Sequence, residues 1–169
     1  DGGLTFCERK LPDGFPCGDF GKIDSANKTE IRGETGKTSG FYLALAEYGL
    51  WKLMYDPGKG VGGCGEKVVV RRLSGRGDTV FCVGLGVGRP GGDYFTEDKA
   101  LFVTGTIGGK YGFYRTLDEG GTFERLNTDR QQFGEINSVD GDCRIFGRFF
   151  LATGSNGILY GEPEEKSCS

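Results

Sequence analysis

We infer the architecture of this chain from the stretch Thr116-Leu117-Asp118-Glu119-Gly120-Gly121-Thr122-Phe123. Strand-like segments rich in aromatic and apolar residues lie on either side, at 111–115 and 122–126. The short side chain of Asp118 can accept hydrogen bonds from the turn's own N–H groups, and the glycine pair that follows permits the positive φ angles of a tight hairpin. Phe123 supplies an apolar anchor. The stretch therefore predicts a β-hairpin closed by Asp118.

The stretch has the pattern Ser/Thr-x-Asp-x-Gly-x-Thr-aromatic and in this respect is similar to the Asp-box, a hairpin motif of certain β-propellers. The residues in the pattern positions are Thr116, Asp118, Gly120, Thr122 and Phe123. The pattern recurs at the start of the chain, where Asp1, Thr5 and Phe6 take the aspartate, threonine and aromatic positions, and a degenerate copy surrounds Asp56 at 55–61. Repeats of about 40 to 50 residues, each a small sheet, are typical of propeller blades.

The recurrence predicts an all-β fold, a partial β-propeller of about three four-stranded blades with Asp-box hairpins. The alternative is an ordinary β-sandwich with three unrelated hairpins. We expect one segment with the end of a blade at 1–11, a blade at 20–73, a second at 79–127 and closing strands at 133–162. Within it the predicted strands are 4–11, 20–25, 41–46, 50–54, 67–73, 79–86, 100–106, 111–115, 122–126, 133–138, 144–153 and 156–161, with polar loops at 26–39 and 88–98.

The composition argues against several classes of function. The chain has 169 residues, 33 of them Gly, a net charge of −3 and no His. Without a basic patch we expect no nucleic-acid partner, and without a long apolar run we expect no membrane span. The absence of His removes the usual general base and metal ligand. No Cys-x-x-Cys pair is present either, so we expect no metal and no cofactor.

The six cysteines favour disulfides in a secreted, extracellular protein, because their number is even and their spacing does not fit zinc. They are Cys7, Cys17, Cys64, Cys82, Cys143 and Cys168. Six cysteines allow fifteen pairings. Cys7 with Cys17 and Cys64 with Cys82 are plausible local links, and the others stay open. Asn27 begins an Asn-Lys-Thr sequon and is a predicted glycosylation site.

The last part of the chain resembles the C-terminal end of glycoside hydrolase family 74, whose members are xyloglucanases and related enzymes acting on β-1,4-glucans. The residues that carry the resemblance are 108–123, Arg125-Leu126-Asn127, Gln131-Gln132-Phe133-Gly134, 142–153 and 156–163. Residues 95–163 match well, and residues 1–94 match loosely. Phe133 stands where the family has Trp or Tyr, a His usual near Gln131 is absent, and Cys143 stands where Pro is common.

The resemblance implies two seven-bladed propellers in tandem, with the substrate cleft between them and two aspartates as inverting acid and base. It places both catalytic regions outside this chain, so we predict no catalytic residue here. Asp1 and Asp118 are read as turn residues, and Asp129, Asp140 and Asp142 as loop residues. The chain would then supply scaffold and cleft wall. Its partners would be a polysaccharide, xyloglucan or another β-glucan, and the remaining blades of a longer chain or copies of itself.

Three aromatic residues are candidate sugar contacts. Tyr94 and Phe95 lie in a loop rich in Gly and acidic residues, whereas Trp51 has the alternative role of packing between blades. A non-catalytic extracellular module that binds glycans or builds a surface assembly is the second hypothesis. A sialidase-type enzyme, which also carries Asp-boxes, is the third; it would need an arginine triad and a Tyr nucleophile.

Overall fold

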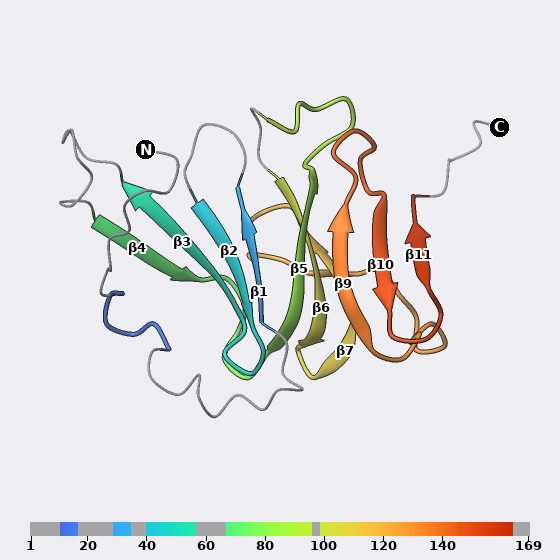
Figure 1. Ribbon diagram of the computed structural model, residues 1–169, viewed down its shortest axis with the longest axis horizontal. Coiled ribbons are helices and arrows are strands. Elements are labelled where there is room, and N and C mark those ends of the chain that lie inside the picture. Colours follow the sequence, from blue (N-terminus) through green and yellow to red (C-terminus); the bar gives the residue numbers. More distant parts are fainter. Residues whose placement is uncertain (1–10, 17–28, 35–39, 57–66, 96–98, 164–169) are drawn as a thin grey trace, which may run out of the picture.

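The computed structural model describes residues 11–16, 29–34, 40–56, 67–95 and 99–163. In these ranges the chain is built of β-strands and turns, without a helix, and it holds no helix long and apolar enough to cross a membrane. The all-β prediction is therefore confirmed. Figure 1 shows the strands gathered in three successive sheets.

Each sheet is an antiparallel meander in which strands adjacent in the chain are adjacent in space. The first contains β1 (Thr29–Gly33), β2 (Gly40–Leu45), β3 (Leu50–Asp56) and β4 (Lys67–Arg72). The second contains β5 (Thr79–Val87), β6 (Lys99–Ile107), β7 (Lys110–Thr116) and β8 (Glu124–Arg125). The third contains β9 (Ile136–Gly141), β10 (Phe149–Thr153) and β11 (Ile158–Gly161).

The sheets pack face to face, and two apolar layers join them. Buried residues of β2, β3, β5, β6 and β7 form the layer between the first and second sheets; Tyr42, Leu101 and Tyr114 belong to it. Phe102, Phe113 and Leu151 belong to the layer between the second and third sheets. Because alternate side chains of a strand point to opposite faces, the middle sheet contributes to both layers.

The first strands of the three sheets, β1, β5 and β9, lie next to one another (Figure 1). At Gly84 a Cβ atom would lie 2.4 Å from the backbone of Val139 and Asp140. Only glycine permits this approach, so β5 and β9 contact through their main chains. Arg32 Nε donates to the Val83 carbonyl at 3.1 Å, and Val83 N–H donates to Glu30 Oε2 at 3.0 Å, which joins β1 to β5.

Several predicted elements need correction. The loop prediction for 26–39 is wrong at Thr29–Gly33, which is β1. The strands predicted at 133–138 and 144–153 begin later, at Ile136 and Phe149, and only Glu124–Arg125 of the segment 122–126 is a strand. Phe133 has a positive φ of 52°, which regular strand geometry does not allow, so the strand begins after this residue. The predicted strands at 4–11 and 20–25 fall mostly or wholly outside the described residues.

Candidate functional site

The turn at 116–123 has the hydrogen bonds that its sequence predicts. Thr122 N–H and Oγ1 donate to the two carboxylate oxygens of Asp118 at 2.8 and 2.9 Å. Thr116 Oγ1 donates to Asp118 Oδ1 at 2.8 Å and accepts the N–H of Gly120, also at 2.8 Å. Thr116, Asp118 and Thr122 therefore hold one another, and Gly120 takes the positive φ of 88° that the turn requires.

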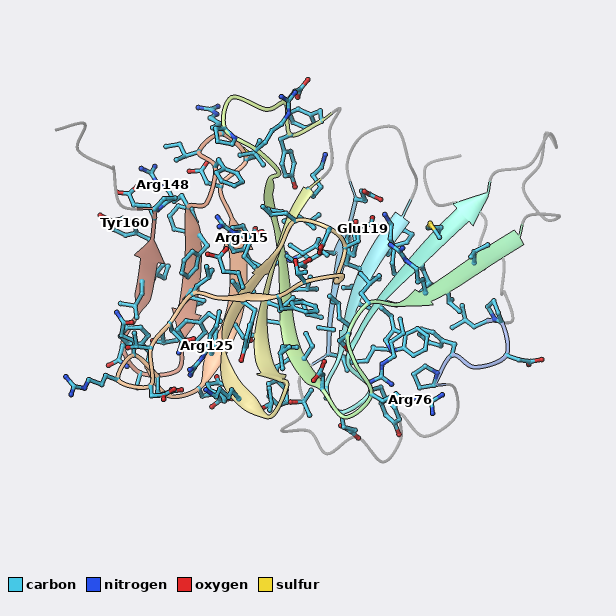
Figure 2. All side chains as sticks on the ribbon, turned by 180° about the vertical axis from the view of Figure 1, so that it is seen from behind. Arg76, Arg115, Glu119, Arg125, Arg148 and Tyr160 are labelled. Carbon is cyan, nitrogen blue, oxygen red and sulfur yellow. The ribbon has the colours of Figure 1, made fainter. Side chains whose placement is uncertain are left out.

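This turn is fixed to the first sheet through Glu119. Its Oε1 lies 2.5 Å from Lys52 Nζ and accepts a hydrogen bond from the Tyr42 hydroxyl at 3.2 Å, while Oε2 pairs with Arg71. Glu34 Oε2 lies 3.3 Å from the same Lys52 Nζ, whose side chain is only 7% exposed. The cluster carries charge into the interface between two sheets, and Figure 2 shows Glu119 at this junction.

The aspartates considered for catalysis have structural partners. The Thr122 N–H, joined by the hydroxyls of Thr116 and Thr122, lowers the pKa of Asp118. The hydrogen bond from Arg125, 2.6 Å long, lowers the pKa of Asp129.

Asp142 and Asp140 also bind backbone amides. Burial raises the pKa of Asp142, but the N–H groups of Arg144 and Ile145 outweigh it, so the pKa lies below its usual value. Asp140 Oδ1 accepts the N–H of Leu85 at 3.1 Å. A general acid needs a raised pKa, so Asp118, Asp129 and Asp142 are poorly suited to that role.

The three candidate sugar-binding aromatics differ in exposure. Trp51 is 9% exposed, lies 5.3 Å from the Phe15 ring and donates its indole N–H to the Tyr48 carbonyl, so it belongs to the core of the first sheet. Tyr94 is partly buried against the first layer, with Lys99 Nζ 4.8 Å from its ring centroid. Phe95 is 62% exposed and stands edge-on to Tyr94. Phe95 thus offers the more accessible ring.

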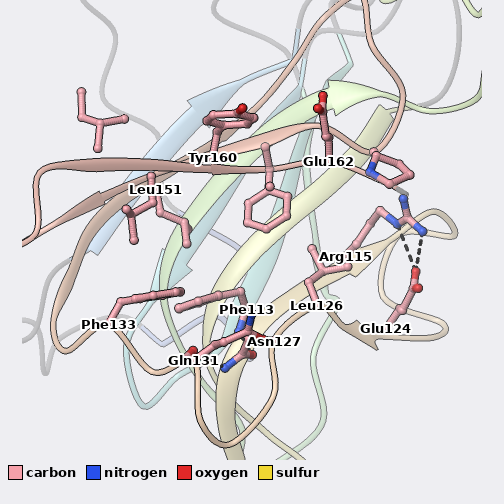
Figure 3. A pocket seen from close by; sticks show the side chains of 16 residues that line it. Phe113, Arg115, Glu124, Leu126, Asn127, Gln131, Phe133, Leu151, Tyr160 and Glu162 are labelled. Atoms are coloured by element: carbon pink, nitrogen blue, oxygen red, sulfur yellow. Dashed lines mark hydrogen bonds and ion pairs between the residues drawn. The ribbon is translucent and has the colours of Figure 1, made fainter. Parts of the chain in front are cut away.

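A groove of about 690 Å³, which the sequence patterns do not predict, lies between the outer strands of the second and third sheets (Figure 3). Phe113, Leu126, Phe149, Leu151 and Leu159 contribute its apolar wall. At one end Arg115 donates to Glu124 Oε2 from both Nε, at 3.1 Å, and Nη2, at 2.5 Å. The groove depends on contacts between strands far apart in the chain, so no local pattern could have located it.

The opposite end of the groove is polar. Asn127 Oδ1 accepts the Phe113 N–H at 2.9 Å, and its amide donates to the Gln131 carbonyl at 3.0 Å. Phe133 stacks on Phe113 with ring centroids 6.1 Å apart and is 38% exposed. Gln131 and Phe133 of the Gln-Gln-Phe-Gly motif therefore line the groove.

Some predicted site residues lie outside the described part of the chain. They are Asp1, Thr5, Phe6, Asn27, Cys7, Cys17, Cys64 and Cys168. Of the two described cysteines, Cys82 is buried with its Sγ 3.7 Å from the Ile136 carbonyl, and Cys143 is exposed. Among the described side chains, no group of three or more potential ligands gathers as a metal site would require.

Comparison with known proteins finds xyloglucanases. A xyloglucanase of Acetivibrio thermocellus is 37% identical over 164 residues, which is 96% of this chain and 16% of that protein. A probable oligoxyloglucan-reducing end-specific xyloglucanase of Neosartorya fischeri is 33% identical over 54% of this chain and 11% of its own length. The chain thus spans about a sixth or less of these relatives. No family model matches it.

Comparison with solved structures also finds enzymes of glycoside hydrolase family 74. The xyloglucanase of Xanthomonas campestris, of glycoside hydrolase family 74, superposes with a TM-score of 0.64 and 30% identity over 83% of this chain and 17% of its own. A family 74 enzyme of Niastella koreensis shares the fold at a TM-score of 0.53 and 23% identity, over 75% of this chain and 18% of its own. The three sheets and these likenesses define a partial β-propeller. The resemblance to glycoside hydrolase family 74 is confirmed, and the chain is homologous to part of its xyloglucanases.

Proposed function

We propose that this chain is the C-terminal segment of a secreted glycoside hydrolase that acts on xyloglucan or a related β-1,4-glucan. The observation that carries the proposal is the 37% identity to a xyloglucanase over 96% of the chain. Since the chain corresponds to only 16% of that relative, the substrate cleft would be completed by further blades of the same polypeptide. The blades within the chain would be 20–73 and 79–127, followed by closing strands at 133–162.

In this proposal the segment supplies scaffold and cleft wall, and the acid and base lie elsewhere. The lowered pKa values of Asp118, Asp129 and Asp142 support this division, because an inverting hydrolase needs one carboxyl group that stays protonated. The turn at 116–123 acts as an Asp-box, the repeat motif also called BNR, and locks one blade to the preceding one through Glu119.

We further propose that the protein works outside the cell, as a disulfide-containing glycoprotein modified at Asn27. An even number of cysteines and the Asn-Lys-Thr sequon support this. Phe95 is the leading candidate for a sugar contact, because 62% of its surface is open to a ligand. Tyr94 would hold the Phe95 ring in place at a centroid distance of 5.4 Å.

The test is hydrolysis of xyloglucan by the native polypeptide that contains this chain, compared with hydrolysis by the 169-residue chain alone. The proposal expects the native polypeptide to release oligosaccharides and the 169-residue chain to release none. Failure of the native polypeptide to cleave xyloglucan or another β-1,4-glucan would refute it.

A second candidate is a non-catalytic extracellular module that binds glycans. Asp118 is held by hydrogen bonds within its turn, and the Phe95 ring is exposed. Both observations also fit this role. Binding of xyloglucan without cleavage by the native polypeptide would favour this module over the hydrolase.

A further inference from the structure

The turn that joins β10 to β11 contains the dipeptide Asn156-Gly157 (Figure 1). Residues 154–157 are exposed, so solvent reaches both members of the dipeptide. Asparagine is a thermolabile residue, because the backbone nitrogen of the following residue can attack its side-chain carbonyl carbon. A glycine in the following position leaves that nitrogen without a side chain beside it. The turn therefore combines the two reacting groups with access to water.

Thr153 holds the backbone on both sides of the peptide bond between Asn156 and Gly157. Its hydroxyl accepts the Asn156 N–H at 2.8 Å and donates to the Gly157 carbonyl at 3.0 Å. The Thr153 N–H donates to the same carbonyl, also at 3.0 Å. The N–H of Gly157 has no acceptor among the residues that the structure describes. The attacking nitrogen is therefore not held by a hydrogen bond to the described chain.

The surroundings of the dipeptide leave room for the reaction. Gly157 has a φ of 73°, and a Cβ placed on it would have no atom of the described chain within 4 Å. The Asn156 amide nitrogen donates to the Phe133 carbonyl at 3.3 Å, which is longer than the usual range of about 2.7 to 3.2 Å. The side chain that would react is therefore held only by a weak contact.

We propose that Asn156 is a deamidation site. The Gly157 nitrogen gives its proton to a base in solvent and forms a bond to Asn156 Cγ, while the Cγ–Nδ2 bond breaks and Nδ2 takes up a proton and leaves as ammonia. Water then opens the resulting succinimide ring at either of its carbonyl carbons, which gives aspartate or isoaspartate. The net reaction consumes one water and releases one ammonia, so it needs no oxidant and no second protein.

The nitrogen that leaves is the atom that bonds to Phe133. After the reaction the Phe133 carbonyl loses this donor, and a negatively charged carboxylate takes the place of the amide beside it. Phe133 stacks on Phe113 at the polar end of the groove (Figure 3), and the nearby Glu135 carbonyl accepts the Gly154 N–H at 2.8 Å. Deamidation therefore loosens the contact between this turn and residues 133–135.

Peptide mapping of the native polypeptide after storage at mildly alkaline pH tests the proposal. The tryptic peptide 149–166 contains Asn156 as its only Asn or Gln, so a mass gain from replacing NH₂ by OH belongs to this residue. Asn156 should react at least about tenfold faster than Asn127, which is 8% exposed and must first be released by local opening. The product should include isoaspartate. No mass gain in the native polypeptide, or a gain without isoaspartate, would overturn the proposal.

Two variants of the native polypeptide test the route and its consequence. Asn156→Gln keeps an amide but would need a larger ring, so peptide 149–166 should keep its mass; a gain like that of the parent would contradict the succinimide route. Asn156→Asp carries the product carboxylate from the start. Its Gly154 amide should exchange with deuterium at least about tenfold faster than in the unmodified parent, because the acceptor on Glu135 is released. Unchanged Gly154 exchange would refute the loosening of residues 133–135.

Discussion

Glu119 of the second sheet and Lys52 of the first sheet meet at 2.5 Å, across the interface between two successive sheets. The glutamate has a positive φ of 52° and stands in the turn that Asp118 closes. The same turn that ends one hairpin therefore also fixes its sheet to the preceding one.

Replacing Lys52 by Met should destabilise the protein strongly, since the lysine also neutralises Glu34, whose side chain is 11% exposed. Removing one partner of a buried pair costs about 3 kcal/mol or more, because the other charge stays buried. Urea unfolding of the variant measures the loss. Arg71→Met is the matched control, since Arg71 binds the same carboxylate but is 49% exposed and should cost below about 1 kcal/mol. Equal losses in the two variants would contradict this account.

Gly120→Ala should destabilise the turn for two reasons. Gly120 has a φ of 88°, and an added Cβ would lie 2.1 Å from the Leu73 carbonyl oxygen. The left-handed conformation alone costs about 1 to 2 kcal/mol, and the clash adds to it. Gly109→Ala has a φ of 79° with no atom within 4 Å, so it isolates the conformational cost. Thermal unfolding of both variants should show the larger loss at Gly120, and equal losses would rule out the clash.

Asp118 should contribute to the acid sensitivity of the protein. The Thr122 N–H lowers its pKa in the folded state, so its contribution is present above the unfolded pKa of about 3.9 and is lost as the pH falls through the lower folded value. Asp118→Asn should lower stability at neutral pH, because an amide cannot accept both Thr122 hydrogen bonds, and should weaken the pH dependence below about pH 4. Unfolding midpoints across that range measure both effects. An unchanged slope in the variant would mean that Asp118 is not the titrating group.

Phe95→Ala and Trp51→Ala should separate binding from packing. Loss of the exposed Phe95 ring should weaken xyloglucan binding about fivefold, which corresponds to about 1 kcal/mol, with little change in stability. Trp51 is 9% exposed, so its replacement should cost about 3 kcal/mol or more of stability. Calorimetric titration and urea unfolding of the native polypeptide report the two quantities. Unchanged affinity in Phe95→Ala would remove Phe95 from the proposed site.

The sequence predicted structure most accurately where the stabilising contacts join residues that are close together in the chain. The turn at 116–123 was predictable because Thr116, Asp118 and Thr122 bond within a few residues of one another. Strand β1 was missed because Glu30 and Arg32 make it polar. Their partners lie on Val83 in the next sheet, and no hydrophobic pattern records such contacts.

The sequence analysis placed the start of β10 too early, although the sequence contains a turn signal at Asp142. Asp142 accepts the N–H groups of Arg144 and Ile145, as short Asp side chains do in turns, and this turn ends β9 before Phe149 begins the next strand. The groove depends on Phe113, Phe133 and Leu159 meeting from three separate segments. Its position therefore required the structure.

The mass of the native polypeptide under denaturing and reducing conditions tests the central claim most directly. The 169 residues account for 18.2 kDa, and the chain matches 16% of its xyloglucanase relative. A hydrolase built on that plan should have a mass several times larger than 18.2 kDa that persists after reduction. A native species near 18.2 kDa would contradict the claim that this chain is one segment of a longer xyloglucan-degrading propeller protein.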